Sequence, residues 1–460
     1  MGSSLFKPFS APRNIAALSL VAFAMGGCSG RSAPGTIPVA AVGAPAPAPG
    51  TKAAVTSKIE HVIIVLLENR STDNVFHFYD HSKADIADSG LDHNNNVVML
   101  QPRSFTEPTD AGHDHIDFVK TFNNGANNGW DTNSQSTDRL YQYGYLPKGE
   151  VQPYLDIANQ FAMSDRFFHG ITAPTFPSHV EIGASTTFGV FGNPSVSIPW
   201  GCDAAAGTTT VSLDASGAEV PGPFPCFTGQ SIFDLFDRKG VTWRYYDEPE
   251  GASITGNLVI PAAFRPLRFG LDWNTNIAKS DKEINTALSA GTLPQVSYVI
   301  PDATSTDHAA TPSAGPTYIA NLVNAFGASR YYNNSVMIVT WDDWGGWYDH
   351  VVPKKRPDGS QLSYRKPILF VGGYVKRGYV THVETEDASI NRSLEEWFGL
   401  GSLGQHDVFT TTFDDVFDFS KPPAPLVPIN PTMIVTPTNA TPVLVPIPSK
   451  IMGKLRSTAD

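Results

Sequence analysis

Four short runs of polar residues hold side chains that could do chemistry, and three of them contain metal-ligand types. Glu68 and Asn69 follow an apolar run directly, Asp342 and Asp343 follow a second, and His308 comes shortly after a third. Carboxylate and amide oxygens suit hard divalent cations, and histidine beside them suits zinc and other transition metals. Each run alone also fits a solvated strand end or a helix cap. The prediction of a metal site therefore depends on the runs meeting in the fold.

The fourth run, residues 170–179, offers a hydroxyl nucleophile. Thr175 lies between Pro174 and Pro177, and proline restricts the backbone on either side of it. A rigidly held hydroxyl beside a metal ion is what a phosphoryl-transfer nucleophile requires, because the metal lowers the hydroxyl pKa and shields the incoming phosphate. The alternative interpretation is a proline-bounded turn with an idle threonine.

The first three runs follow segments that have the pattern of buried strands. Residues 62–67, 296–300 and 336–340 are nearly continuous apolar runs, as is 367–371, and residues 390–398 show the apolar spacing of an amphipathic helix. Strands that alternate with helices predict an α/β fold with a mostly parallel central sheet flanked by helices. Ligands of such sheets bind beyond the carboxyl ends of the strands, so we expect the polar runs to meet at that edge.

Composition narrows the class of protein. The 460 residues are 41% hydrophobic and 17% charged, which is too apolar for a disordered chain. A net charge of −12 argues against a nucleic-acid partner held by phosphate contacts. An anionic substrate stays open, because a bound metal reverses the local sign of charge. Three cysteines exclude a disulfide scaffold and a four-thiolate metal site.

The N-terminal residues predict export. Residues 1–27 have a basic start and a short apolar core and end in two glycines, which is typical of a signal peptide. Cys28 resembles the lipidated cysteine of a bacterial lipoprotein, although plain cleavage stays open. Residues 28–56 are rich in Ala and Pro and are expected to form a tether. The expected location is the periplasm, an outer-membrane anchor through the lipid, or the medium.

The rest of the chain is interpreted as one catalytic domain, residues 57–420, followed by a Pro-rich C-terminal tail, residues 421–460. The prolines exclude the tail from a central strand, and we expect it to wrap the surface. Outside the cytosol Cys202 and Cys226 can form a disulfide. The alternative is a pair of buried free thiols.

The motifs, in this order, resemble the bacterial phosphoesterase family that contains phosphatidylcholine-type phospholipases C and certain acid phosphatases. That family belongs to the alkaline phosphatase superfamily, so the resemblance implies an alkaline-phosphatase-like fold. It extends from Ile59 to about Ser420. The motifs that carry it are Glu68-Asn-Arg-Ser-Thr-Asp73, Asp110-Ala-Gly-His113, Asn124-Gly125, Ala173-Pro-Thr-Phe-Pro-Ser-His179 and Trp341-Asp-Asp-Trp-Gly-Gly-Trp-Tyr-Asp-His350.

The resemblance implies a role for each matching residue. A divalent metal ion, whose identity is open among Zn²⁺, Ca²⁺, Mg²⁺ and Mn²⁺, would be bound with Thr175 as both ligand and nucleophile. Asp307 would orient the neighbouring His308. The other implied metal ligands are Glu68, Asn69, Asp342 and Asp343, and the histidines that would donate to phosphate, bind a second metal or act as general acid are His113, His308 and His350.

Two departures from the family motifs affect the site. Asp343 stands where glutamate is usual, which shortens this ligand by one methylene. Ser178 and His179 replace an Asn-Arg pair, so an arginine is lost. His179 can replace it only in part, because imidazole lacks the rigid guanidinium fork.

These observations predict an exported metal-dependent phosphoric-ester hydrolase that acts through a phospho-threonine intermediate. Its substrate would be a phosphate ester, as for an acid phosphatase, or a phospholipid, as for a phospholipase C. Trp130, Trp344 and Trp347 could hold a choline group by cation–π contact, but we favour packing for them. A sulfatase or phosphonate hydrolase is disfavoured because Thr175 cannot mature to formylglycine. A non-catalytic surface lipoprotein with a degenerate site is the remaining alternative.

Overall fold

The computed structural model describes residues 55, 57–133, 138–195, 199–247, 260–309, 314–435 and 444–445. The predicted signal peptide, Cys28 and nearly all of the predicted tether lie outside these residues. Among the helices of the described ranges, none has both the length and the apolar character that crossing a bilayer requires.

A seven-stranded sheet consists, in spatial order, of β10 (Trp243–Tyr246), β11 (Val296–Val299), β1 (His61–Leu67), β12 (Ser335–Trp341), β13 (Ile368–Val371), β6 (Ala162–Ser164) and β14 (Tyr379–Thr381). Strands β10, β11, β1 and β12 pair in parallel, and so do β6 and β14. Strand β13 runs antiparallel to both of its neighbours. The predicted α/β fold with a mostly parallel sheet is therefore confirmed.

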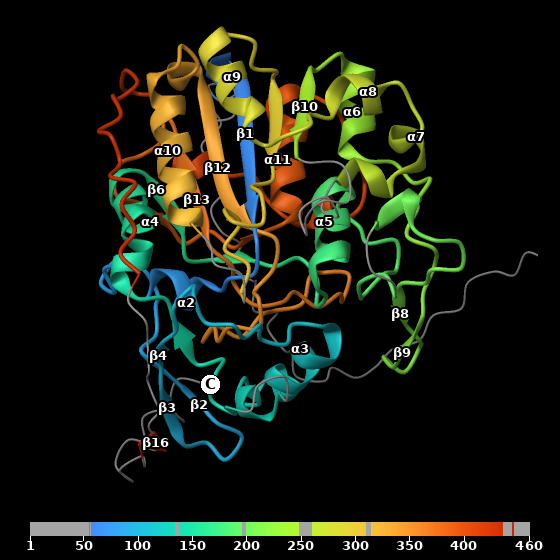
Figure 1. Cartoon of the computed structure of the whole chain (residues 1–460), viewed down its shortest axis with the longest axis vertical. Helices are drawn as coiled ribbons and strands as arrows, with labels where there is room; N and C mark the ends of the chain where they lie inside the picture. The colour runs from blue at the N-terminus through green and yellow to red at the C-terminus, as the bar shows by residue number, and fades with distance from the viewer. Residues whose placement is uncertain are drawn as a thin grey trace, which may run out of the picture. The chain divides into compact units, whose positions relative to one another are not determined.

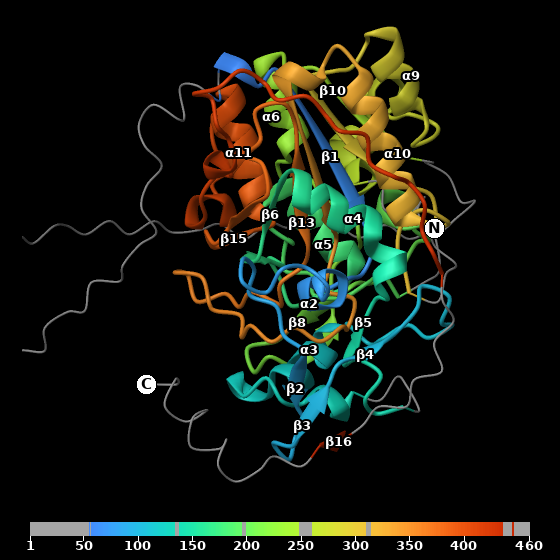
Figure 2. The same ribbon diagram turned by 90° about the vertical axis from the view of Figure 1, so that its left-hand side faces the viewer.

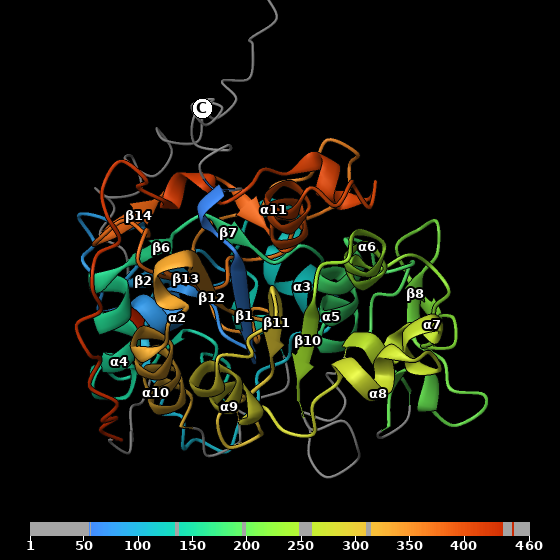
Figure 3. The ribbon, with the colours of Figure 1, turned by 90° about the horizontal axis from the view of Figure 1, so that it is seen from above.

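Helices cover both faces of this sheet. On one face α4 (Lys148–Gln160) and α9 (Glu283–Ala290) pack against α10 (Gly315–Ala328). On the other face α5 (Thr175–Ala184) packs against both α6 (Ile232–Lys239) and α11 (Ala388–Phe398); Figure 3 shows the helices from above. Because both faces are covered, the strands are apolar throughout, and residues 62–67 of β1 are all buried.

A layer of smaller elements lies beyond the carboxyl end of β1 (Figure 1). It contains α2 (Thr72–Phe76) and α3 (His115–Phe122), together with short strands. The strands are β2 (Ser89–Leu91), β3 (Val97–Met99), β4 (Gln101–Pro102) and β5 (Gly144–Tyr145). The carboxyl edge of the sheet, where the polar runs are expected to meet, therefore lies next to this layer.

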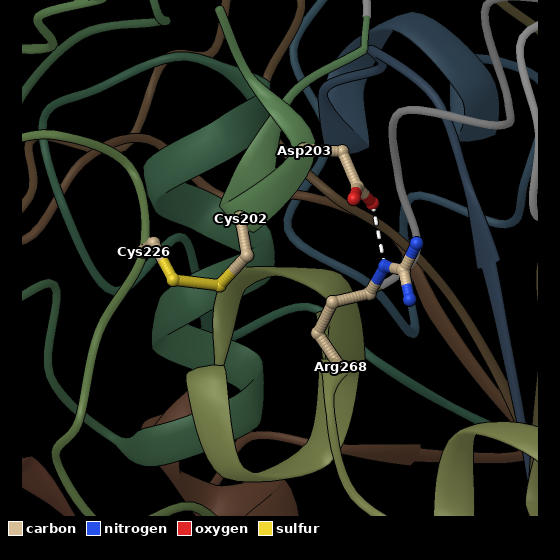
Figure 4. The surroundings of a disulfide bond; sticks show 4 residues. All are labelled: Cys202, Asp203, Cys226 and Arg268. Atoms are coloured by element: carbon tan, nitrogen blue, oxygen red, sulfur yellow. Dashed lines mark hydrogen bonds and ion pairs between the residues drawn. A yellow bond between two sulfur atoms is a disulfide. The ribbon is translucent and has the colours of Figure 1, made fainter. Parts of the chain in front are cut away.

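Residues that follow α5 form an irregular region beside the β10 edge. It holds a hairpin of β8 (Val211–Leu213) and β9 (Glu219–Pro221), and the short helices α7 (Arg265–Arg268) and α8 (Asp272–Asn276). The sulfurs of Cys202 and Cys226 are bonded to each other here, with Cα atoms 4.5 Å apart (Figure 4). Beside them Arg268 Nε lies 2.6 Å from Asp203 Oδ2.

The first part of the C-terminal tail, residues 421–435, is an extended segment that runs along α4 and α10 (Figure 2). The amide of Asn324 donates to the Ile429 carbonyl at 2.8 Å, and the Thr317 hydroxyl donates to the Pro431 carbonyl at 2.7 Å. Further along, β16 (Leu444–Val445) pairs antiparallel with β3 at the edge of a three-stranded sheet. A two-stranded pairing of β7 (Phe167–Phe168) with β15 (Thr385–Glu386) completes the described strands.

Candidate active site

The register of two neighbouring strands brings the first two polar runs together. Strands β1 and β12 are parallel, and Leu67 lies opposite Trp341 at their carboxyl ends. The next residue of each strand is a carboxylate, Glu68 on one and Asp342 on the other. The main-chain N–H of Asn69 donates to Asp342 Oδ1 at 3.0 Å, which ties the two turns to each other. The predicted meeting of these runs at the sheet edge is confirmed.

The helix that begins with Thr175 supplies a third group to this pair. Thr175 is the first residue of α5 and is buried, and His179 lies one turn further along the same face of the helix. His179 Nε2 is 3.8 Å from Glu68 Oε1 and 3.9 Å from Asp342 Oδ2. The three side chains are buried, and their ligand atoms all lie within 4.8 Å of one another. We call Glu68, Asp342 and His179 the carboxylate–histidine group.

A second set of side chains lies beside the carboxylate–histidine group. His113 Nε2 is 3.8 Å from Asp343 Oδ2 and 3.3 Å from Asn69 Nδ2. The other ring nitrogen of His113 is held by the Ala111 carbonyl at 2.7 Å. Because Asp343 follows Asp342 directly and Asn69 follows Glu68, the two sets share the same pair of turns.

Two glycines allow these turns to pack tightly. Gly345 and Gly346 have φ values of 61° and 70°, in the left-handed region that glycine adopts without strain. A Cβ atom on Gly345 would lie 2.2 Å from the Asn69 carbonyl oxygen, and one on Gly346 would lie 2.6 Å from the Gly112 carbonyl oxygen. The Gly-Gly step of the late motif therefore lets the turn after β12 contact both other turns of the site.

The site concentrates buried negative charge. Burial raises the pKa of Glu68 well above its ordinary value, and the charge of Asp342 raises it further. Burial and Asp342 act in the same way on the pKa of Asp343. Burial lowers the pKa of His113, but the charges of Asp343 and Asp110 outweigh it and the pKa rises to about 10. Carboxylates that repel one another in a dry site would be stabilised by a divalent cation.

The residues present fit such a cation. Among the described residues, Asn69 Oδ1, Asp342 Oδ2 and Asp343 Oδ2 are buried oxygens with no hydrogen-bond partner. These oxygens are therefore available to bind a cation. Together with a histidine nitrogen they form a mixed oxygen and nitrogen donor set, which suits Zn²⁺ or Mn²⁺ better than a site of oxygens alone.

His308 lies on the loop that follows β11, next to Glu68. The main-chain N–H of Glu68 donates to the Thr306 carbonyl at 2.7 Å. The charge of His308 acts on the Glu68 carboxylate and lowers its pKa against the larger effect of burial. The ring itself is oriented by the Ala309 carbonyl, which lies 2.6 Å from His308 Nδ1.

Asp307 is hydrogen-bonded to three neighbouring segments through its side chain and its main chain. Its carboxylate accepts hydrogen bonds from the Tyr154 hydroxyl at 2.7 Å and from Trp341 Nε1 at 3.2 Å. Its carbonyl accepts from Arg70 Nη2 at 2.8 Å. Asp307 therefore anchors the loop after β11 to the turn after β1, which fixes the position of the neighbouring histidine.

His350 belongs to a separate charged network. Its Nδ1 is 2.8 Å from Asp73 Oδ2 and its Nε2 is 2.9 Å from Asp85 Oδ1, so carboxylates engage both ring nitrogens. Arg365 is buried in the same network and lies 3.0 Å from Asp73 Oδ1. The structure thus brings His350 into this network and does not bring it into the carboxylate–histidine group.

The three tryptophans near the motifs are buried packing residues. Trp130 meets Trp344 edge to face with ring centroids 5.6 Å apart, and both are fully buried. Trp347 is 1% exposed and packs on Tyr141 at 5.2 Å. The packing interpretation that the sequence favoured is confirmed.

His179 was not among the metal ligands predicted from the sequence. The motif suggested a partial replacement for an arginine, whereas the structure places its Nε2 between two carboxylates. The sequence could have indicated this role, because His179 follows Thr175 by four residues and the two share a face if the run is a helix. The two prolines in the run argued against a helix.

The fold and the site define an α/β protein with a buried carboxylate and histidine cation site at the carboxyl edge of its sheet. The model of the Phosphoesterase family matches residues 59–401, and the chain belongs to that family. Non-specific phospholipase C6 of Arabidopsis thaliana is 22% identical over 306 residues, which are 59% of this chain and 52% of that protein. Phospholipase C A of Mycobacterium tuberculosis is 23% identical over 344 residues, 66% of this chain and 61% of that one.

The chain therefore spans about half to three-fifths of the length of these two relatives. Among solved structures, a protein in the alkaline phosphatase superfamily from Vibrio parahaemolyticus matches with a TM-score of 0.36 and 9% identity. That match covers 87% of this chain and 86% of the other.

Proposed function

We propose that this protein is an exported metal-dependent phosphoric-ester hydrolase that acts through a phospho-threonine intermediate. The observation that carries the proposal is the carboxylate–histidine group, formed in a chain of the Phosphoesterase family next to the helix that Thr175 begins. The names of the relatives, which are phospholipases C, support the same class of reaction.

A divalent cation would be held by Glu68, Asp342 and His179, with Asn69 and Asp343 supplying further oxygens. When bound, such a cation would lower the pKa of a neighbouring hydroxyl and screen the charge of the phosphate. The chain supplies two further features. The amino end of α5 is the positive end of its dipole, and the His113 ring lies beside the proposed cation site, with Nε2 3.8 Å from Asp343 Oδ2.

In the first step the Thr175 oxygen attacks phosphorus in line with the leaving oxygen. A bond forms between phosphorus and the threonine oxygen, the ester bond breaks, and the hydroxyl proton passes to solvent or a nearby base. His113 or His308 gives a proton to the departing oxygen. Water then attacks the phospho-threonine, which releases phosphate or a phosphorylated head group and restores Thr175. His350 is an unsuitable proton donor because Asp73 and Asp85 bind its ring.

The substrate is a phosphate monoester or a phosphodiester such as a phospholipid. The relatives favour the phosphodiester, whereas the burial of Trp130, Trp344 and Trp347 removes the aromatic residues that could have held a choline group. A broad phosphatase or phosphodiesterase fits both observations.

Export, with a lipid anchor at Cys28 or plain cleavage after residue 27, belongs to the same proposal. The disulfide between Cys202 and Cys226 supports it, because disulfides persist in oxidising compartments such as the periplasm. The expected location is the periplasm, the outer membrane or the medium.

The test is hydrolysis by the purified chain, without residues 1–27, of p-nitrophenyl phosphate, p-nitrophenylphosphorylcholine and p-nitrophenyl sulfate. Each is measured before and after chelation and with Zn²⁺, Mn²⁺, Ca²⁺ or Mg²⁺ added back. We expect turnover of a phosphate substrate that chelation removes and one metal restores. Turnover of the sulfate alone would indicate a sulfatase, and no turnover with any metal would favour the non-catalytic lipoprotein.

A further inference from the structure

The main-chain carbonyl of Asp342 is held by two buried side chains. Ser178 Oγ donates to it at 2.5 Å and Lys366 Nζ donates to it at 2.6 Å. Ser178 lies on α5, immediately before His179. Lys366 comes from a different part of the chain and is fully buried. A buried ammonium therefore contacts the backbone of a proposed metal ligand.

The antiparallel direction of β13 brings Lys366 to this position. Strand β13 pairs with β12 so that Ile368 lies opposite Thr340, and the Thr340 hydroxyl donates to the Pro367 carbonyl at 2.8 Å. Continuing this register by two residues places Lys366 opposite Asp342. A parallel strand would have carried this side chain to the other end of the sheet.

Lys366 also connects the site to the loop that leads to Thr175. Its ammonium forms an ion pair with Asp387 Oδ1 at 2.5 Å, and Asp387 Oδ2 accepts a hydrogen bond from the Gly170 N–H at 2.7 Å. Gly170 opens the nucleophile loop, and a Cβ atom there would lie 3.2 Å from the Cβ of Asp387. The carboxylate of Asp387 thus contacts Lys366 with one oxygen and the N–H of Gly170 with the other.

The segment around Lys366 is bonded to the chain just before that loop. The Lys366 N–H donates to the Phe167 carbonyl at 3.1 Å, and the His169 N–H donates to the Tyr364 carbonyl at 3.0 Å. His169 is fully buried, and burial followed by the charges of Lys366 and Arg356 holds its pKa well below the ordinary value. His169 is therefore neutral, and Lys366 is the cation that faces Asp387.

A buried ion pair of this kind is not explained by stability. Removing an ammonium and a carboxylate from water carries a large free-energy penalty, and apolar residues in their place often give equal stability. What apolar residues could not do here is donate to the Asp342 carbonyl and accept from Gly170 at once.

We propose that Lys366 and Asp387 are positioning residues that hold the metal-ligand turn of Asp342 at a fixed distance from the nucleophile loop. This inference rests on the proposed function, because the distance between the Asp342 turn and the nucleophile loop matters only if Thr175 acts on a substrate at the metal site. Thr175 and the carboxylate–histidine group come from different segments, and small displacements between reacting groups cost about 100-fold in rate. The lysine, the aspartate and Ser178 connect the two segments behind the site.

The test compares two double variants. K366M/D387N removes both charges and the donor to Asp342, but keeps an oxygen that can accept from Gly170. K366Q/D387N also removes both charges, but keeps an N–H donor at position 366. The matched control is R244M/E283Q, which removes a 2.8 Å ion pair between Arg244 on the edge strand β10 and Glu283 at the start of α9.

Two properties of each chelator-stripped protein are measured. The first is the Kd for Zn²⁺ alone by calorimetry, repeated with Mn²⁺, and the second is kcat and KM on p-nitrophenyl phosphate. For K366M/D387N we expect a Kd raised about 10- to 100-fold and a kcat lowered to a similar extent, with KM little changed. K366Q/D387N should recover part of both losses, and the control should match wild type.

Wild-type affinity and kcat in a folded K366M/D387N protein would overturn the inference. If that variant does not fold, the single variant D387N carries the test, because it removes the carboxylate that Lys366 and Gly170 share and keeps an oxygen for the Gly170 N–H. A lowered kcat with KM unchanged supports the inference, and a wild-type kcat overturns it. A wild-type protein that binds metal but hydrolyses nothing would defeat the proposed function, and the Kd comparison would then still test whether Lys366 and Asp387 hold the metal-ligand turn. A wild-type protein that binds neither metal would defeat both.

Discussion

Glu68 and Asp342 are neighbours because the parallel register of β1 and β12 ends with Leu67 opposite Trp341. Each strand is followed by one carboxylate at the same edge of the sheet. The Nε2 atom of His179, on α5, lies within 4 Å of an oxygen of each carboxylate. Three buried side chains from three separate segments thus form a group that could hold a metal ion, and its geometry depends on the sheet.

Replacement of Thr175 by alanine should abolish turnover while leaving the fold intact. The side chain is small and begins a helix, whereas it supplies the attacking oxygen in the proposed reaction. We expect kcat on the preferred phosphate substrate to fall about 1000-fold or more. T175S keeps a hydroxyl and should retain measurable activity, and T317A, a threonine on α10 that bonds the tail, should behave as wild type. Substantial turnover by T175A, with an unchanged circular dichroism spectrum, would exclude a phospho-threonine mechanism.

Replacement of His179 by alanine should weaken metal binding. Its Nε2 is the nitrogen of the carboxylate–histidine group, so the variant would leave a cation with Glu68 and Asp342 but without that nitrogen ligand. We expect the Kd for Zn²⁺, measured by calorimetry, to rise about 100-fold, at the upper end of what loss of supporting contacts causes. H382A changes a histidine whose side chain is 64% exposed and serves as the matched control. Equal affinity in H179A and wild type would remove His179 from the ligand set.

The network of His350 should make the protein lose stability as the pH rises above neutrality. Burial lowers the pKa of His350, but Asp73 and Asp85 outweigh it and raise the pKa to about 10. A group whose folded pKa exceeds its unfolded value of about 6.5 stabilises fully below about 6.5 and loses that stabilisation as the pH rises through 10. The free energy of unfolding, measured in urea from pH 6 to 10, should therefore fall more steeply for wild type than for H350Q.

The carboxylate partner of His350, Asp73, should make the protein lose stability as the pH falls. Burial raises the pKa of Asp73, but the charges of His350 and Arg365 outweigh it, and the pKa lies below its ordinary value. That stabilisation is present above about pH 4 and is lost as the pH falls. H61Q, which changes a histidine bonded to the Pro294 carbonyl, is the control. Parallel curves for H350Q and wild type would show that this network does not contribute to the pH dependence.

Removal of the disulfide should destabilise the folded chain. Cys202 and Cys226 are 24 residues apart, and closing a loop of that size restricts the unfolded chain. We expect C202S/C226S to lower the free energy of unfolding by about 2–4 kcal/mol. A reductant should lower the stability of wild type by a similar amount and leave the variant unchanged. A response of both proteins to the reductant would assign the effect to something other than this bond.

Much of the fold follows from local patterns in the sequence. The continuous apolar run at residues 62–67 predicts a strand buried on both faces, and the same pattern marks β11 and β12, because helices cover both sides of the sheet. Once three strands of this kind are parallel, their carboxyl ends share one edge. The proximity of Glu68 to Asp342 is therefore predictable from the sequence alone.

The direction of β13 and the partners of the histidines depend on contacts between distant segments. The run at residues 367–371 predicts a strand but not its direction, and the antiparallel direction is what places Lys366 beside Asp342. His350 closely follows the residues predicted to bind a metal, yet Asp73 and Asp85, more than 260 residues away along the chain, bind its ring.

The side chains that could bind a metal, the strands that carry them and the edge at which they meet are therefore predictable from local sequence patterns. The place of His179 beside Glu68 and Asp342, and of His350 in another network, depends on the assembled fold. Apolar periodicity is a local property, because it reflects the burial of neighbouring residues in one element. The direction of a side chain toward a partner hundreds of residues away is set by strand direction, register and helix packing, and these form only when the whole core assembles.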